Sequence, residues 1–209
     1  MESMIEELYL PIFLQTLIVD TVGTFGIYIK VKNKMVLYHS GGDSFTNNVC
    51  ENLIQNNIDV VFIRKKDKEN YKKYLAENLP GILKSDEFPG EEKAEIAHSS
   101  ITNIAKSLFE SPRAKTITKF KNVISATMEF ILDDDEAINN LIKLTSYDFT
   151  TYTHSVNVGI FAIGLAKILF SGDSNHNMNE IGSGFFLHDI GKSNIPLTIL
   201  TKRGKLTDV

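Results

Sequence analysis

Cysteine is almost absent from this 209-residue chain, and Cys50 is its only representative. A single cysteine cannot form a disulfide within the chain, and it cannot supply the paired thiolates of a CxxC metal site. A lone cysteine is most often a small buried hydrophobic residue, and we interpret Cys50 in this way. Internal disulfides and cysteine-pair metal sites are therefore excluded.

Signals for export and for membrane insertion are also missing. The first seven residues, Met1 to Glu7, are acidic and lack the basic region that opens a signal peptide. The most apolar run, Val158 to Phe170, is interrupted by Lys167 and is shorter than the ~20 residues that span a bilayer. We therefore expect a cytoplasmic protein that makes no membrane contact.

The chain has no excess of positive charge. Its net charge is -4, with 43% hydrophobic and 23% charged residues, as in an ordinary soluble globular protein of one large or two small domains. Such a chain is not a general binder of nucleic-acid polymers. An anionic substrate would have to meet a local positive site, made by metal ions or by a few basic side chains.

Strand signals are confined to the first part of the chain. Residues 25–31 alternate and are rich in β-formers, and residues 35–39 follow as the returning strand of a hairpin that turns at Asn33–Lys34. The short apolar run at residues 58–63 predicts a third strand. These strands, with the helices between them, predict an α+β N-terminal domain that contains a small mixed sheet.

Two helices are expected in this N-terminal domain. The apolar residues from Phe45 to Ile54 recur at helical spacing, and Ser44 is a suitable N-cap. The stretch Gly41–Phe45 resembles the GGDEF signature of diguanylate cyclases. Its fourth position is Ser44 and not an acid, so we interpret it as a hairpin end followed by a helix cap. A second helix is predicted over residues 66–78, before Pro80–Gly81.

From Glu91 onward the pattern is helical, which predicts an all-α second part. The predicted helices run from residue 96 to just before Pro112, over 117–131, 137–144, 151–170 and 180–189. Within residues 91–145, the apolar positions also approximate the a/d spacing of a coiled coil. A homodimer through these helices is therefore a further hypothesis. The set with this spacing is Ile117, Phe120, Ile124, Ile131, Ile138 and Leu141.

The chemistry is concentrated in two segments, Tyr152–Val158 and Phe186–Pro196. In the second segment His188 and Asp189 are adjacent, so that one imidazole nitrogen and two carboxylate oxygens are available to divalent metal ions. His154 lies on the preceding long helix and meets this pair if the two helices pack together. A metal site made by these three side chains is the prediction.

Lys192 follows His188 by four positions and is expected on the same helical face. Its ammonium group would there meet a phosphate oxygen beside the metals. Taken alone, each residue has a simpler interpretation: an adjacent His and Asp often mark an exposed helix end, and a lysine often complements the helix dipole. The joint pattern is what favours a site.

This joint pattern resembles the HD superfamily of metal-dependent phosphohydrolases, and within it the HD-GYP subfamily of cyclic di-GMP phosphodiesterases. The resemblance runs from about Tyr147 to the last residue. A His-Asp-x-Gly-Lys core at 188–192 indicates only the superfamily. Its continuation through Ile195–Pro196 and then Ile199–Thr207, which reads IL-x-K-x-G-x-LT, is much more specific to HD-GYP proteins.

The resemblance implies an HD-type helical domain with two divalent metal ions, most often iron or manganese. It implies that His154, His188 and Asp189 hold the metals, and that Lys192 and Asp189 are catalytic. The implied substrate is cyclic di-GMP, which is hydrolysed to pGpG or GMP. Some family members bind a third metal through a glutamate at the position of Thr150, so the threonine favours a two-metal site.

The resemblance also suggests that the HD domain is truncated. The family's later ligands and its GYP segment would lie beyond Val209, and Lys205–Asp208 read as the beginning of another helix. We therefore expect a fragment that does not hydrolyse cyclic di-GMP by itself. Two alternatives stay open: an HD phosphohydrolase that acts on another nucleotide, and a non-catalytic signalling protein with an incomplete HD site.

The domain organisation expected from these patterns has three parts. Residues 1–88 form an N-terminal regulatory or sensor domain, which also resembles a domain found ahead of HD-GYP modules. Residues 89–146 form a helical connector, and residues 147–209 form the N-terminal part of the HD-GYP catalytic domain.

Overall fold

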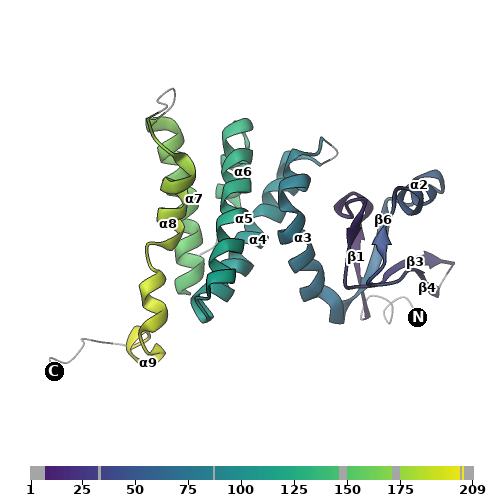
Figure 1. Cartoon of the computed structure of the whole chain (residues 1–209), viewed down its shortest axis with the longest axis horizontal. Helices are drawn as coiled ribbons and strands as arrows, with labels where there is room; N and C mark the ends of the chain where they lie inside the picture. Colours follow the sequence, from purple (N-terminus) through teal and green to yellow (C-terminus); the bar gives the residue numbers. More distant parts are fainter. Residues whose placement is uncertain are drawn as a thin grey trace. The chain divides into compact units, whose positions relative to one another are not determined.

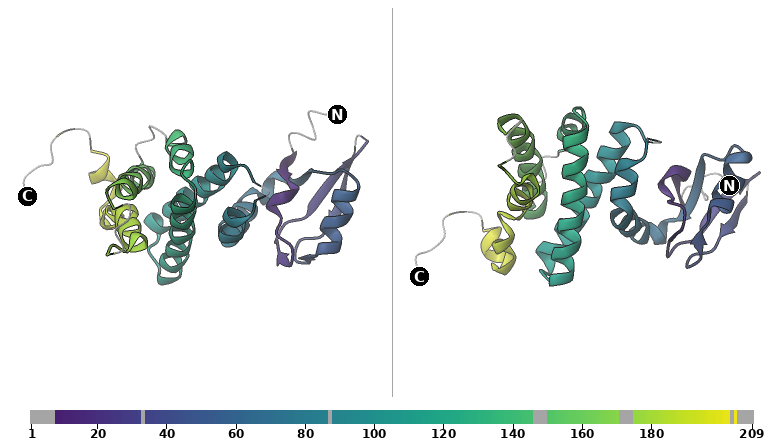
Figure 2. Two further views of the ribbon diagram at one scale, coloured as in Figure 1. Left: turned by 90° about the horizontal axis from the view of Figure 1, so that it is seen from above. Right: turned by 45° about the horizontal axis from the view of Figure 1, so that its top comes forward.

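The computed structural model describes residues 8–32, 34–86, 88–145, 150–170, 175–202 and 204 (Figures 1 and 2). The chain forms two compact units, Met1–Pro89 and Gly90–Val209. Several predicted features lie outside the described residues: the turn residue Asn33, the boundary residue Glu87, Tyr147, and the family-like positions 203 and 205–207.

The N-terminal unit is built on a four-stranded sheet with the order β1-β6-β3-β4. Its strands are β1 (Tyr9–Phe13), β3 (Ile27–Val31), β4 (Lys34–His39) and β6 (Val60–Arg64), and β2 (Thr21–Val22) pairs separately with β5 (Ser44–Phe45). The hairpin and the third strand are confirmed, and so is the predicted fold class. The sheet is antiparallel and not mixed, because β6 inserts between β1 and β3 and runs opposite to both.

The strand β1 was not predicted from the sequence. It contains Pro11, which lacks an amide hydrogen and normally argues against a strand. The structure places β1 at the edge of the sheet, where only one side of the strand needs hydrogen bonds. Proline is tolerated in that position.

Two helix boundaries differ from the prediction. Ser44 lies in β5 and does not cap a helix; the helix α2 (Asn47–Gln55) begins after Thr46, because residues 44–45 pair with β2. After the short 3-10 turn η2 (Lys65–Asp67), the helix α3 (Lys68–Lys84) continues through Pro80. A proline inside a helix costs about 3 kcal/mol, and the burial of Leu79 and Ile82 around it offsets that cost.

One face of the sheet packs against α2 and α3 around three aromatic rings. The Phe25 ring meets Tyr71 and Tyr74 edge-on, at centroid distances of 5.5 and 5.4 Å. The Tyr71 hydroxyl donates to Thr16 Oγ1 at 2.7 Å, and that of Tyr74 accepts the Ile18 amide at 2.8 Å. Each buried phenol is thus tied to the 3-10 turn η1 (Leu14–Thr16) or to the loop that follows it.

The burial of Tyr71 leads to a prediction about alkaline pH. Burial raises the pKa of Tyr71 to about 12, although its hydrogen bond with Thr16 acts in the opposite direction. The neutral phenol is therefore favoured in the folded state, and its contribution to stability is complete below about pH 10 and is lost as the pH rises through 12. The absorbance of phenolate at 295 nm, as the difference between the wild type and Tyr71→Phe, should show a midpoint near 12. A midpoint near 10 would contradict the buried position.

The C-terminal unit is helical, as predicted, and its helices pack side by side (Figure 2). The helix α7 packs against α8, α4 and α6, while α5 packs against α4 and α8. The elements are α4 (Gly90–Glu110), α5 (Ala114–Asp133), α6 (Ala137–Lys143), α7 (Thr151–Leu169), α8 (Met178–Leu187), the 3-10 turn η3 (Ile190–Asn194) and the short α9 (Leu197–Leu200).

The proposed coiled-coil seam is occupied within the unit itself. Phe120, Ile124, Ile131 and Leu141 are all 0% exposed and belong to the core of this unit. Apolar residues at a/d spacing pack equally well inside a single helical bundle, and these residues do so here. The structure therefore gives no support to a homodimer through these residues.

The helix α7 is apolar on both sides. Val156, Ile160 and Ile163 face the core, whereas Phe161, Leu165 and Ile168 are 51–75% exposed. Within the described residues, α7 is the one helix long and apolar enough to cross a membrane, by length and composition only. A core helix passes the same test, and α7 packs against three neighbouring helices, so this feature is weak grounds for a membrane span.

Candidate metal centre

The first ligand candidate, His154, lies in the first turn of α7. The Thr150 carbonyl accepts the His154 amide at 2.9 Å, and the Thr150 hydroxyl donates to Thr153 Oγ1 at 2.7 Å. Thr150 therefore forms part of the helix start. His154 itself is exposed, with 54% of its side chain accessible.

The second segment is positioned by α8. Asn177 caps this helix, because its side-chain oxygen accepts the amides of Asn179 and Glu180 at 3.1 and 3.3 Å. The helix α8 ends at Leu187 and does not continue to Lys192. His188 closes it, and Asp189 lies between α8 and η3.

A close approach of α7 and α8 brings the two segments together. A Cβ atom on Gly159 of α7 would lie 2.3 Å from Cδ1 of Phe186 on α8, and one on Gly182 of α8 would lie 3.3 Å from Cδ1 of Ile163 on α7. Gly159 has no room for a side chain, and Gly182 is tightly packed. Gly159 and Phe186 lie within two turns of His154 and His188, so this contact sets the spacing across the site.

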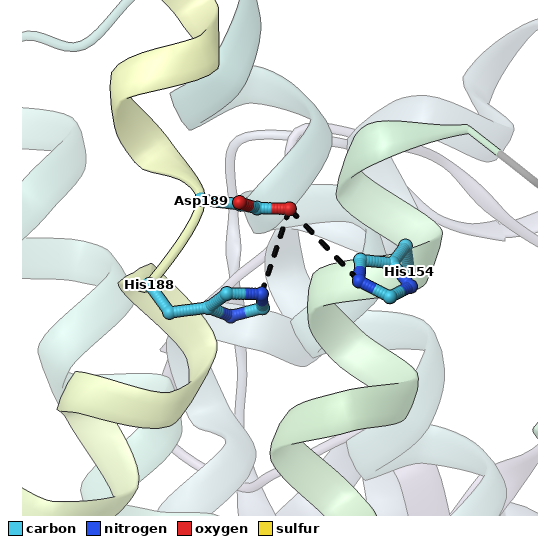
Figure 3. A group of neighbouring side chains, drawn as sticks. All are labelled: His154, His188 and Asp189. Carbon is cyan, nitrogen blue, oxygen red and sulfur yellow. Dashed lines mark ion pairs between the residues drawn. The ribbon is translucent and has the colours of Figure 1, made fainter.

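Three side chains converge there (Figure 3). Oδ2 of Asp189 lies 3.5 Å from Nε2 of His188 and 3.9 Å from Nε2 of His154. The two imidazole rings meet at a centroid distance of 5.7 Å, and one ligand atom from each residue lies within 4.8 Å of the others. Neither backbone segment could form this arrangement alone.

The tautomer of His188 is fixed by its neighbour. Nδ1 lies 2.7 Å from the carbonyl oxygen of Phe185, which can only accept a hydrogen bond. Nδ1 therefore carries the hydrogen, and the lone pair of Nε2 faces Asp189 and His154. A backbone carbonyl that orients a metal-binding histidine in this way is a common feature of metal sites.

Asp189 is the most enclosed member of the group, with 16% of its side chain accessible. Burial by itself would raise the pKa of its carboxyl group. The hydrogen bond from Lys192 and the nearby imidazoles of His188 and His154 outweigh burial and hold that pKa below its ordinary value. The carboxylate is therefore ionised at neutral pH, as a metal ligand must be.

Lys192 also faces this group, in a way that differs from the prediction. It lies in η3 and not on a helical face shared with His188, because α8 has already ended. Its ammonium nitrogen lies 2.5 Å from Oδ2 of Asp189. The predicted contact with a substrate phosphate stays a prediction.

The donor set fits a divalent metal ion. Ligand atoms that share an ion at about 2.0–2.2 Å lie roughly 3–3.5 Å apart, so donors at 3.5 and 3.9 Å need only a small inward movement. Two imidazole nitrogens and a carboxylate suit zinc, iron or manganese. Among the described residues, this is the one group of histidine, cysteine and acidic side chains close enough to hold an ion.

Sequence reasoning missed two features that support the site. One is the Phe185 carbonyl that orients His188, which no motif signals. The other is the contact between Gly159 and Phe186; a glycine inside an apolar helix near His154 could have indicated it, since such glycines often mark close packing. The other histidines of the described residues lie outside the cluster, including the half-buried His98 on α4, whose pKa is lowered by burial.

Comparisons with known proteins agree with this picture. The chain is 42% identical over 78 residues to the cyclic di-GMP phosphodiesterase PA4108 of Pseudomonas aeruginosa, a stretch that covers 37% of this chain and 18% of that protein. The structure of the present chain resembles that of Bd1817, a HDG"Y"P protein from Bdellovibrio bacteriovorus, with a TM-score of 0.53 and 27% identity. The match covers 90% of this chain and 62% of Bd1817. No protein-family model matches the chain.

The cluster of His154, His188 and Asp189 between two adjacent helices is the arrangement expected of an HD-type helical domain. The likeness to Bd1817 and to PA4108 supports the resemblance to HD-GYP proteins that the sequence motifs indicate. The chain spans less than two thirds of the length of either relative.

Proposed function

We propose that the helical unit carries metal-binding residues of a cyclic di-GMP phosphodiesterase. The main evidence is that His154, His188 and Asp189 each place a potential ligand atom within 4.8 Å of the other two. The similarity to PA4108, which is named as a cyclic di-GMP phosphodiesterase, supports the choice of substrate. Hydrolysis would add water across one P–O ester bond to give pGpG, and across a second such bond to give two molecules of GMP.

Each residue has a role that follows from its surroundings. His154 and His188 would bind through Nε2, and Asp189 would bind through its carboxylate, whose lowered pKa keeps it ionised. Two divalent ions, iron or manganese, would supply an activated water and neutralise phosphate charge. Lys192 would place its ammonium group against a phosphate oxygen.

The ligand set of the described residues is small for two ions. The three side chains offer four donor atoms, whereas two divalent ions take about four to six ligands each. We therefore propose that the 209-residue chain binds metal but does not by itself hydrolyse cyclic di-GMP at a useful rate. Metal-dependent turnover by the purified chain would contradict this part of the proposal.

The remaining organisation is proposed on the same basis. Residues 1–88 would be a regulatory or sensor domain, 89–146 a helical connector, and 147–209 the catalytic part, in a cytoplasmic signalling protein. The observed division after Pro89 is compatible with the first of these boundaries.

The substrate can be tested by equilibrium dialysis of the purified chain with labelled cyclic di-GMP, with and without Mn²⁺. We expect binding that depends on Mn²⁺, is lost in Asp189→Ala and persists in His176→Ala, where an exposed histidine outside the cluster is removed. Binding that unlabelled GTP displaces as well as cyclic di-GMP does would favour another nucleotide. Failure of cyclic di-GMP to bind in the presence of Mn²⁺ would contradict the proposal.

A further inference from the structure

One oxygen atom, Oδ2 of Asp189, has three groups that turn toward it. The imidazole Nε2 atoms of His188 and His154 lie 3.5 and 3.9 Å away, and the ammonium of Lys192 lies 2.5 Å away. The two imidazole nitrogens are on the side where a shared metal ion would bind (Figure 3). Among the ion pairs that Asp189 makes with described residues, the one with Lys192 is the shortest.

An ammonium group and a divalent ion compete when they need the same carboxylate oxygen. Both are attracted by its negative charge, and they repel one another at the separation that a shared oxygen imposes. The hydrogen bond from Lys192 also uses electron density that a metal–oxygen bond would use. Binding of the ion is therefore opposed as long as the ammonium stays in place.

Lys192 has the freedom to leave this position. Its side chain is 42% accessible, against 16% for Asp189, and it extends from the short 3-10 turn η3. A lysine side chain is flexible and strongly hydrated, so an exposed ammonium moves at low cost. The backbone around Asp189 need not change when it moves.

We propose that Lys192 is a built-in competitor of the metal ion, which neutralises Asp189 until an ion displaces its ammonium and so releases it toward a substrate phosphate. This inference rests on the metal site of the proposed function. It assigns one side chain two successive partners, the carboxylate first and the phosphate afterwards. Metal loading would thereby also prepare the residue that receives the substrate.

The alternative role for the same contact is support. A lysine that stays on Asp189 and orients it would strengthen metal binding, as hydrogen-bonding partners behind metal ligands usually do. The two roles differ in sign. If Lys192 competes, its removal tightens metal binding; if it supports, its removal weakens metal binding.

The test is the dissociation constant of Mn²⁺, measured by calorimetric titration of the folded protein without nucleotide. Lys192→Met keeps most of the side-chain volume and removes the charge, and we expect it to bind Mn²⁺ about tenfold more tightly, the low end of what a neighbouring charge does to an ionic equilibrium. Lys192→Arg keeps the charge and should stay near the wild type. Lys121→Met, on the exposed side of α5, controls for the loss of one positive charge elsewhere and should change the constant less than twofold.

A second readout separates this role from a structural one. With saturating Mn²⁺, Lys192→Met should bind cyclic di-GMP more weakly than the wild type, so that the same change affects metal and nucleotide in opposite directions. Unchanged or weaker Mn²⁺ binding by Lys192→Met would overturn the inference while leaving the metal site intact. Absence of Mn²⁺ binding by the wild type would overturn the proposed function together with it.

Discussion

Replacement of Phe186 by Ala will lower the free energy of unfolding by about 3–5 kcal/mol, the usual cost of removing a large aromatic side chain from a core. Phe186 is 2% exposed, its ring meets that of Phe120 edge-on at 6.3 Å, and it lies against Gly159. The cavity would open directly beneath the end of α8, so His188 and Asp189 would lose their support as well. Urea unfolding followed by circular dichroism measures the change.

A matched control is available on the neighbouring helix. Phe161 is 51% exposed on α7, and Phe161→Ala removes the same atoms without leaving a buried cavity. We expect it to cost less than about 1 kcal/mol. Equal losses for Phe161→Ala and Phe186→Ala would contradict the packing described for α7 and α8.

The contact with Gly159 can be tested by a double-mutant cycle. Gly159→Ala alone should cost about 1–3 kcal/mol, since its Cβ would meet the Phe186 ring at 2.3 Å and force one helix to move. In the Phe186→Ala background the same methyl group enters the cavity, and its cost should largely disappear. Strictly additive effects would show that the two residues are not in contact.

Replacement of Asp189 by Ala will weaken Mn²⁺ binding by at least about 100-fold. Changes to residues that only orient metal ligands already cost 10–100-fold, and Asp189 is the carboxylate that both imidazoles face. Its substitution removes both oxygen donors and the negative charge while leaving His154 and His188 in place. Calorimetric titration with Mn²⁺ gives the constant.

Two further variants define the cause of that loss. Asp189→Asn keeps the shape and one oxygen but removes the charge, so we expect a loss intermediate between the wild type and Asp189→Ala. His176→Ala, outside the cluster, should bind as the wild type does. Binding by Asp189→Ala within threefold of the wild type would mean that the ion is held elsewhere.

The parts of the structure that the sequence predicted are those governed by local spacing. The alternation of residues 25–31 and the returning segment at 35–39 marked the hairpin, and helical periodicity marked α4 to α8. The strand β1 escaped prediction because its partner β6 lies some fifty residues away and because Pro11 argues against a strand. Antiparallel pairing of distant segments depends on tertiary contacts that no short window contains.

The same distinction applies to the candidate site. The adjacency of His188 and Asp189 and the helical setting of His154 are local, and they were enough to predict that the three would meet. The pairing of Lys192 with Asp189 was not predicted, although their spacing of three residues, which makes side chains neighbours on a helical turn, could have indicated it.

The central claim is that His154, His188 and Asp189 together hold a divalent ion, and nuclear magnetic resonance tests it most directly. In the histidine-labelled protein, substoichiometric Mn²⁺ should broaden the imidazole signals of His154 and His188 first, because the ion is paramagnetic and those rings would bind it. The signals of His39, His98 and His176 should persist at the same ratio. Uniform broadening of all five histidines, or selective loss of a signal outside the cluster, would contradict the account.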